Sequence, residues 1–228
     1  MLRTLALVHA SLDGGSPIET AEGLAVNLRD YLVSLPLRGG ERIYEANIAR
    51  ELNVSRPLVR EACRVLQGEG ILAYTPNKGY SLRSLSRKEV LHLVEFRVLL
   101  EEAAFASAAA RPDRAELIEK LNKACESMEK HSVQEDTAAQ ISDDLAFHRL
   151  VIEFSENPWL IESFDRMSTQ FRYAIRLMSR SPQDFKIYAP SHEVLINSIA
   201  GGDEQVAREE IRRHIRMFIP SLVKRIGE

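Results

Sequence analysis

From residue 86 onward the chain consists of helix-length segments in which apolar residues recur every three or four positions. Short runs rich in Pro, Gly, Ser and Asp separate these segments, and no strand-like alternation interrupts them. The first segment opens with a capping box, because Glu89 follows Ser86 by three residues. Consecutive helices joined by short loops pack antiparallel, so we expect an all-α antiparallel helical bundle. The predicted helices cover roughly 87–110, 113–131, 137–155, 158–180, 183–200 and 203–226.

The chain before this bundle has a different order of elements. Residues 18–34 are amphipathic, a short helix is expected from about Tyr44, and "NV" predicts a tight turn. Ser55 is a predicted N-cap of the next helix, which Gly70 ends, and "ILAY" and "YSLR" around "TPNKG" predict a β-hairpin. This is the element order of a winged helix-turn-helix. The expected mainly α fold has a flexible arm at 1–16, a winged helix-turn-helix at 17–83 and the helical domain at 84–228.

Composition is that of an ordinary soluble protein, with 45% hydrophobic and 28% charged residues. The two cysteines, Cys63 and Cys125, lie far apart, which argues against a disulfide scaffold and fits a reducing compartment. No stretch is long enough to span a bilayer, and the N-terminal apolar run is too short for a signal peptide. We therefore expect a cytoplasmic protein.

The net charge of −3 conceals a basic segment near the front of the chain. Residues 53–83 hold five basic and two acidic residues, whereas residues 84–228 hold 20 basic and 24 acidic residues. Such polarisation is compatible with nucleic-acid binding by the basic segment, even though the whole chain is acidic.

Three arginines, Arg56, Arg60 and Arg64, recur every four residues on one side of the second predicted helix, opposite an apolar face. An arginine fork binds the O6 and N7 atoms of guanine together, or a phosphate. We therefore expect this helix to enter the DNA major groove, with Lys78 at the hairpin tip touching backbone or minor groove. The alternative is that the arginines only form a solvated helix face, paired with Glu61.

The run "LRGGERIYEANIARELNVSRPLVREACRVLQGEGIL" resembles the N-terminal domain of GntR-family bacterial transcription regulators. The shared pattern is a Gly-rich turn followed by "L-x-E-x-x-L-A", "V-S-R-T-P-V-R-E-A-L" and "E-G-L", and the resemblance covers about residues 18–83. It implies DNA contacts from Ser55, Arg56 and Arg60 at the start of the recognition helix and from Lys78 and Gly79 in the wing.

The helical domain carries four polar residues on apolar helix faces. Asp144 and His148 lie four residues apart on one face of a helix, and His192 and His214 lie on the apolar stripes of two later helices. A lone histidine on such a face is usually a satisfied core residue. A buried carboxylate without a partner is costly, however, and a divalent cation would compensate all four groups. Three imidazoles and one carboxylate suit Zn²⁺, Ni²⁺ or Mn²⁺ better than Ca²⁺ or Mg²⁺.

These residues also resemble the ligand set of the metal-binding FCD domain, a C-terminal partner of the GntR DNA domain in FadR-like regulators. "DDLAFH" fits the pattern "D-x-x-F-H", and two helix-borne histidines follow it, within a resemblance that covers about residues 86–228. The resemblance implies that Asp144, His148, His192 and His214 hold a divalent metal, most readily Zn²⁺, and that small carboxylates bind near it.

Arg97 is a further anomaly, because it lies on the apolar stripe of the first bundle helix. One interpretation is an ion pair with Glu101 inside the helix. The other is an anchor for the carboxylate of an effector, since a guanidinium binds a carboxylate bidentately, and the resemblance implies a similar arginine in FCD domains. Arg172 and Arg176 are weaker candidates for the same role.

The sequence therefore predicts a DNA-binding transcription regulator, with a repressor favoured by the resemblance. We expect a homodimer on a palindromic operator, whose affinity a small carboxylate at the metal controls. The protein is predicted not to be an enzyme, because no further acid or base lies at a spacing that suggests proton transfer. Two alternatives stay open: a helical-bundle metallohydrolase tethered to DNA, and a regulator whose metal is purely structural.

Overall fold

The structure is a computed structural model that describes residues 19–34, 39–134, 137–178, 188–217 and 219. It divides into two compact units, Met1–Leu85 and Ser86–Glu228, each described by itself below. The predicted arm at 1–16 lies outside the described residues.

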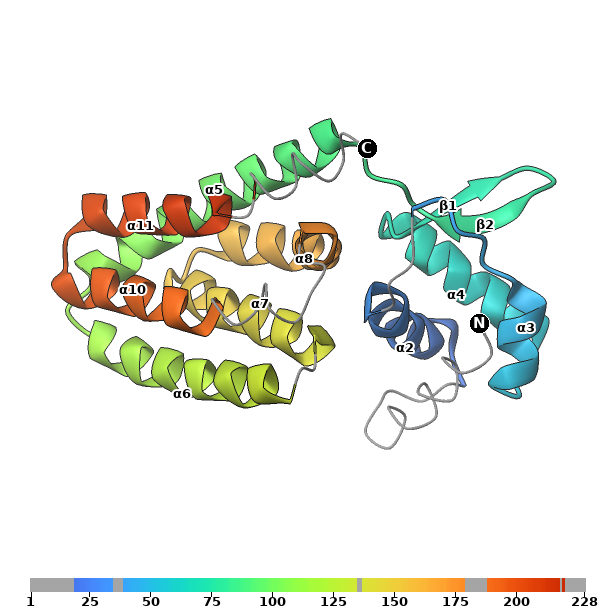
Figure 1. The fold of residues 1–228 in the computed structure, drawn as a ribbon, viewed down its shortest axis with the longest axis horizontal. Helices are drawn as coiled ribbons and strands as arrows, with labels where there is room; N and C mark the ends of the chain where they lie inside the picture. The colour runs from blue at the N-terminus through green and yellow to red at the C-terminus, as the bar shows by residue number, and fades with distance from the viewer. Residues whose placement is uncertain (1–18, 35–38, 135–136, 179–187, 218, 220–228) are drawn as a thin grey trace. The chain divides into compact units, whose positions relative to one another are not determined.

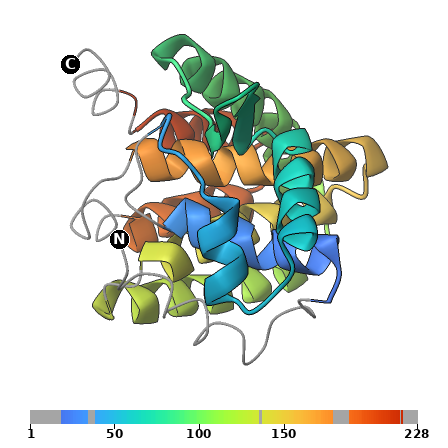
Figure 2. The same ribbon diagram turned by 90° about the vertical axis from the view of Figure 1, so that its right-hand side faces the viewer.

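The described residues of the first unit form three helices and a hairpin (Figures 1 and 2). Helices α2 and α3 both pack on α4, and the rear face of α4 that is buried is apolar. Between α3 and α4 the chain turns at Asn53, whose φ of 52° lies in the left-handed region that asparagine tolerates. These contacts confirm the predicted winged helix-turn-helix. The elements are α2 (Ala21–Ser34), α3 (Glu45–Glu51), α4 (Arg56–Gly68), β1 (Leu72–Thr75) and β2 (Gly79–Leu82).

The hairpin forms the wing of this unit. β1 pairs antiparallel with β2, with Leu72 opposite Leu82 and Thr75 opposite Gly79. The chain re-enters β2 through Gly79, whose φ of 79° would strain any residue with a Cβ atom. Residues 40–43 run beside β2 on the other side, because the N–H of Ile43 donates to the carbonyl of Tyr80 over 2.9 Å.

The second unit is the predicted antiparallel helical bundle. Helix α5 packs against α7, α8, α10 and α11, and α6 packs on α7 and α10 (Figure 1). Alanines at four buried positions of α5 allow close approach of its neighbours. The helices are α5 (Arg87–Ala110), α6 (Arg114–Val133), α7 (Thr137–Phe154), α8 (Pro158–Met178), α10 (Tyr188–Gly201) and α11 (Glu204–Arg216).

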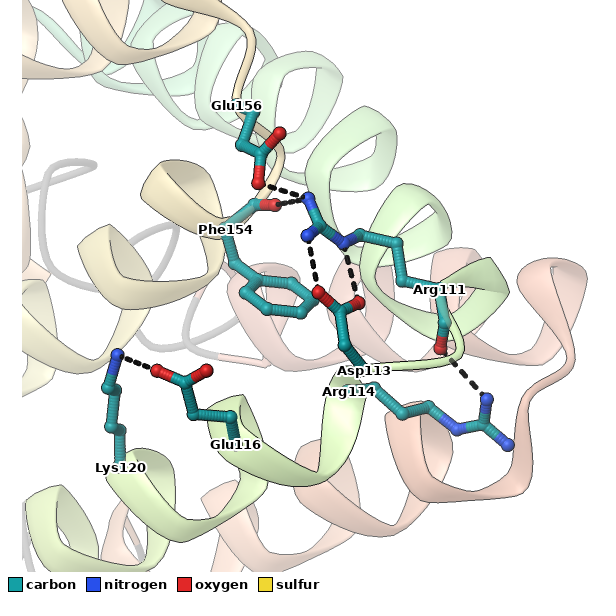
Figure 3. Close-up of polar contacts among 7 residues, drawn as sticks. All are labelled: Arg111, Asp113, Arg114, Glu116, Lys120, Phe154 and Glu156. Atoms are coloured by element: carbon teal, nitrogen blue, oxygen red, sulfur yellow. Dashed lines mark hydrogen bonds and ion pairs between the residues drawn. The ribbon is translucent and has the colours of Figure 1, made fainter.

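Arg111 ties the end of α5 to the end of α7 (Figure 3). Its guanidinium binds Asp113, with Nη2 2.6 Å from Oδ2, and donates from Nη1 to the carbonyl of Phe154 over 3.0 Å. The same Nη1 lies 2.8 Å from Oε1 of Glu156, and the group stacks over the Phe154 ring at 4.2 Å. These contacts fix the α5–α6 turn against the C-terminus of α7, the helix that carries Asp144.

Most helix boundaries follow the predicted ones within a few residues, but one does not. Helix α11, which was expected to reach residue 226, spans Glu204–Arg216 with Met217 as its C-cap, and residues 218 and 220–226 of the prediction lie outside the described residues. Residues 183–187, expected to begin the preceding helix, lie outside the described residues. Among the described helices, none is long and apolar enough to cross a membrane.

The capping box at the start of α5 is formed as predicted. The Ser86 hydroxyl accepts from the N–H of Glu89 over 3.2 Å, and the Glu89 carboxylate accepts from the N–H of Ser86 over 2.8 Å. Because Ser86→Ala removes the cap, we expect it to cost about 1 kcal/mol of folding free energy, which lowers Tm by roughly 2–4 °C. Ser86→Thr should stay near the native Tm in the same circular-dichroism melt. An unchanged Tm for the alanine variant would show that this box does not stabilise α5.

Candidate DNA-binding groove and metal centre

The face of α4 opposite its apolar side forms one wall of a groove that the wing closes. The groove has a volume of about 690 Å³, and Arg56, Arg60 and Arg64 line it from α4. Lys78 and Gly79 line it from the wing. The predicted basic residues of the helix and the wing therefore meet in one concave surface. Such a surface offers positive charge to a nucleic-acid backbone.

Local contacts set the direction of the groove residues. The Ser55 hydroxyl accepts from the N–H of Leu58 over 3.3 Å and so caps α4, as predicted. Arg60 pairs with Glu45 of α3, with Nη2 3.1 Å from Oε2, instead of with Glu61. Glu61 pairs with Arg64 over 2.8 Å. The solvated-face interpretation therefore accounts for Arg64 better than for Arg60, which Glu45 orients within the groove.

In the second unit, α7, α10 and α11 bring together the four polar residues singled out in the sequence. One ligand atom from each of Asp144, His148, His192 and His214 lies within 4.8 Å of the other three. Oδ1 of Asp144 is 3.2 Å from Nε2 of His192 and 3.7 Å from Nε2 of His148. All four residues are buried.

The buried polar atoms of this cluster are poorly satisfied by protein groups. Within the described residues, Asp144 Oδ1, His148 Nε2 and His214 Nδ1 make no hydrogen bond of acceptable geometry. Buried polar atoms in native structures are nearly always hydrogen-bonded, and exceptions indicate an ion, a water or strain. Aromatic rings pack against the cluster, with Phe147 edge-on to His192 at 4.6 Å between centroids and Phe105 at 6.2 Å from His148.

Two residues of α5 form a second layer around the cluster. Arg97 is 7% exposed and donates from Nε to Glu101 over 2.6 Å and from Nη2 to Oδ2 of Asp144 over 3.3 Å. Oε2 of Glu101, which is fully buried, lies 2.5 Å from Nδ1 of His148. The predicted Arg97–Glu101 pair exists, but it is part of a buried ionic network and not a surface pair.

This network sets the protonation of the cluster. Burial opposes ionisation of Asp144, but Arg97 and His148 outweigh it and hold the pKa of that carboxyl well below its usual range. Burial and the neighbouring imidazoles of His192 and His148 hold the pKa of His214 well below its ordinary value. Burial also opposes charging of His148, but Glu101 outweighs it and raises the pKa of this imidazole. At neutral pH, Asp144 is therefore ionised and His214 offers a lone pair.

Sequence reasoning missed Glu101 as a partner of the cluster. The i, i+4 spacing revealed Arg97–Glu101, but the contact with His148 crosses from α5 to α7 and has no local signature. A carboxylate on the outer nitrogen of a histidine is a common way to orient a metal ligand. Asp143, the residue before Asp144 on α7, lies with its Oδ2 2.6 Å from Nδ1 of His131 on α6.

The weaker arginine candidates are only partly described. Arg172 of α8 donates to the hydroxyl of Ser142 over 2.6 Å, two residues before Asp144. The side chain of Arg176 lies outside the described residues. His92 of α5 is exposed and is not part of the cluster.

A winged helix-turn-helix with a basic groove defines the class of DNA-binding regulators. The family of bacterial regulatory proteins named gntR matches residues 20–92, and the FCD domain family matches residues 92–217. The chain belongs to the GntR family of bacterial transcription regulators and carries an FCD domain.

Individual relatives agree with this placement. The chain is 32% identical over 142 residues to the Nta operon transcriptional regulator of Aminobacter aminovorans, covering 62% of this chain and 67% of that protein. It is 27% identical over 210 residues to the gluconate operon transcriptional repressor of Bacillus subtilis, covering 87% and 83%. Among solved structures, E. coli McbR/YncC has the same fold, with a TM-score of 0.71, 20% identity and coverage of 90% and 97%.

These comparisons confirm the predicted class of protein. The chain is a DNA-binding transcription regulator, and these relatives are regulators and not enzymes. The metallohydrolase alternative therefore has no support from them. In the second unit, a buried Asp and His cluster suited to a metal lies within the FCD match.

Proposed function

We propose that a small carboxylate, bound at a divalent metal in the helical unit, controls the affinity of this regulator for its operator. The observation that carries the proposal is the cluster of Asp144, His148, His192 and His214. Three helices bring one carboxylate and three imidazoles within 4.8 Å of one another in a buried site. No protein hydrogen bond satisfies Asp144 Oδ1 or His214 Nδ1 among the described residues, and a cation would satisfy both.

The donor set selects among metals. Metal–nitrogen and metal–oxygen bonds of about 2.0–2.2 Å place neighbouring ligand atoms roughly 3 Å apart, close to the 3.2 Å between Asp144 and His192. Nitrogen-rich sites of this kind suit Zn²⁺ first, with Ni²⁺ or Mn²⁺ as alternatives. When bound, the metal would supply a Lewis acid, and it would take a further ligand beyond the four protein groups only by expanding to five- or six-coordination. Glu101 holds His148 so that Nε2 faces the site, and metal binding displaces any proton at that nitrogen.

The charge of the site favours an anionic effector. Two carboxylates, Asp144 and Glu101, are opposed by Arg97 and by a divalent ion, so a loaded site with neutral imidazoles keeps one uncompensated positive charge. A monocarboxylate neutralises it, and Arg97 is the guanidinium best placed to orient that carboxylate. The gluconate operon repressor, a relative of this chain, is named for a small carboxylate.

We further propose that one unit binds DNA and that the other binds the metal and the effector and forms the dimer. Residues 17–83 bind the operator through Ser55, Arg56, Arg60, Lys78 and Gly79, and residues 84–228 bind metal and effector and form a homodimer. The protein acts in the cytoplasm, and two-fold symmetry would place its two recognition helices in successive major grooves of a palindromic operator. The effector acts only if it binds the DNA-competent and DNA-incompetent arrangements with different affinities. A repressor is favoured by the name of the gluconate operon relative.

Elemental analysis of the purified full-length protein tests the metal. We expect about one divalent ion per chain, or stoichiometric uptake of added Zn²⁺ after chelation. A folded protein that holds no metal and takes up none would refute the metal centre and, with it, metal-dependent effector control.

Arg97→Ala is expected to abolish the change in operator affinity caused by the effector while leaving effector-free operator binding intact. The reason is that Arg97 belongs to the helical unit and its guanidinium lies at the cluster, whereas the basic groove residues all belong to the other unit. The comparison variant is Arg172→Ala, which removes the guanidinium that donates to Ser142, two residues before Asp144. Fluorescence anisotropy on a labelled operator, with metal content checked for each variant, measures the effect. A normal response in metal-loaded Arg97→Ala would reduce Arg97 to a structural ion-pair partner.

A further inference from the structure

The groove between α4 and the wing contains a base that belongs to neither element. Arg42 lies in the segment before α3, and this segment pairs with β2 through an isolated bridge to Ser81. The N–H of Gly40 donates to the carbonyl of Leu82 over 2.8 Å, and the N–H of Leu82 donates to the carbonyl of Glu41 over 2.8 Å. The backbone of Arg42 is therefore fixed to the wing as a short third strand.

The side chain of Arg42 points along the wing toward its tip. Its Nη2 donates to the main-chain carbonyl of Lys78, and its guanidinium lies over the Tyr44 ring with 5.7 Å to the centroid. Arg42 is exposed and lines the groove together with Lys78. An exposed guanidinium held in this way loses less conformational freedom when it binds a phosphate than a freely rotating one would.

The balance of charge in the groove favours a phosphate as the partner of Arg42. Of the described residues that line the groove, five are basic and only Glu45 is acidic, and Glu45 is engaged by Arg60. The other basic residues are Arg56, Arg64 and Lys78, so Arg42 adds positive charge on the wing side of the groove. A DNA strand whose backbone follows the wing would meet Arg42 and Lys78 side by side.

We propose that Arg42 is a further DNA-binding residue of this protein, which contacts a backbone phosphate beside the wing tip. The contact is electrostatic and carries no base preference, because phosphates are the same in every sequence. It is independent of the metal and the effector, since both belong to the other unit.

The test separates the charge of Arg42 from its hydrogen bond to the wing. Arg42→Gln keeps a donor for the Lys78 carbonyl but loses the charge, whereas Arg42→Lys keeps the charge. Operator binding is measured by anisotropy between 50 and 200 mM salt, with Lys120→Ala, an exposed base on α6, as a control for net charge. A lost phosphate contact lowers the slope of log K against log[salt] by about 0.9, so the affinity gap between native and variant protein narrows about threefold over this range.

We expect Arg42→Gln to lose this increment of slope on operator and on random DNA alike, and Arg42→Lys to keep it. A native slope in Arg42→Gln, or a lost slope in Arg42→Lys, would overturn the assignment. So would a loss in Lys120→Ala equal to that in Arg42→Gln, because the effect would then report net charge only. Circular-dichroism melts of both Arg42 variants establish that the first unit is folded.

Discussion

His214→Ala is expected to lose most of its bound metal and the thermal stabilisation that added Zn²⁺ gives the native protein. His214 is buried on α11, its pKa is held well below the ordinary value, and Nδ1 has no hydrogen bond among the described residues. It is therefore a neutral donor aimed at the other three groups. A metal present at about 1,000 times its Kd stabilises the native state by about 4 kcal/mol, and this gain should vanish with the ligand.

His92→Ala is the matched control, because His92 is an exposed histidine of the same unit. It should keep about one metal per chain and the full rise in Tm on adding Zn²⁺. Inductively coupled plasma analysis and scanning calorimetry give the two readouts. Equal metal content in both variants would remove His214 from the ligand set.

Arg60→Ala is expected to weaken binding to the cognate operator by roughly 10- to 100-fold, as for other arginines that read a base or anchor a recognition helix. Arg60 lines the groove on the exposed face of α4, where Glu45 of α3 holds its guanidinium with Nη2 at 3.1 Å. Loss of Arg60 therefore removes a pre-oriented group from the centre of the predicted contact surface.

The control for Arg60 is Lys123→Ala, which removes one exposed positive charge from α6. It should bind the operator like native protein at equal ionic strength. Glu45→Gln is a further probe, because it leaves Arg60 in place but weakens its orientation, and an intermediate affinity is expected. Full operator affinity in Arg60→Ala would show that α4 does not read DNA through this residue.

Local features of the fold could be predicted because each depends on a few adjacent residues. Ser55 and Ser86 cap helices because a hydroxyl reaches a nearby N–H, and Asn53 turns the chain because it tolerates positive φ. The end of α11 was not predictable in this way. Apolar residues continue at helical spacing beyond Arg216, so periodicity does not mark the C-cap at Met217, while residues 218 and 220–226 of the predicted helix lie outside the described residues.

The candidate site shows the same division between local and tertiary information. Asp144 and His148 were paired by their spacing on α7, and His192 and His214 were singled out by their places on the apolar stripes of later helices, in agreement with the family resemblance. Only packing reveals that Arg97 reaches Asp144 across 47 positions of sequence, or that Glu101 reaches His148. Contacts between helices depend on axial shift and rotation, which a periodic pattern does not specify.

The same limit explains why the contacts of Asp143 and Arg42 could not be predicted from the sequence. Asp143 lies about 100° from Asp144 around α7, where helical spacing alone names no partner, but α6 supplies His131 and Ser127 on that side. Arg42 stands outside any predicted element, and only the pairing of its backbone with β2 brings it to the wing tip. Both positions acquire a partner from the fold and not from their neighbours in sequence.

The most direct measurement of the central proposal is operator affinity with and without small carboxylates, for metal-loaded and chelator-treated protein side by side. Our account predicts that a carboxylate such as gluconate, or another member of a panel of small mono- and dicarboxylates, changes the Kd of the metal-loaded protein several-fold. The metal-free protein should still bind operator and should not respond. An equal response by the two forms, or no response by the loaded form to any carboxylate of the panel, would contradict it.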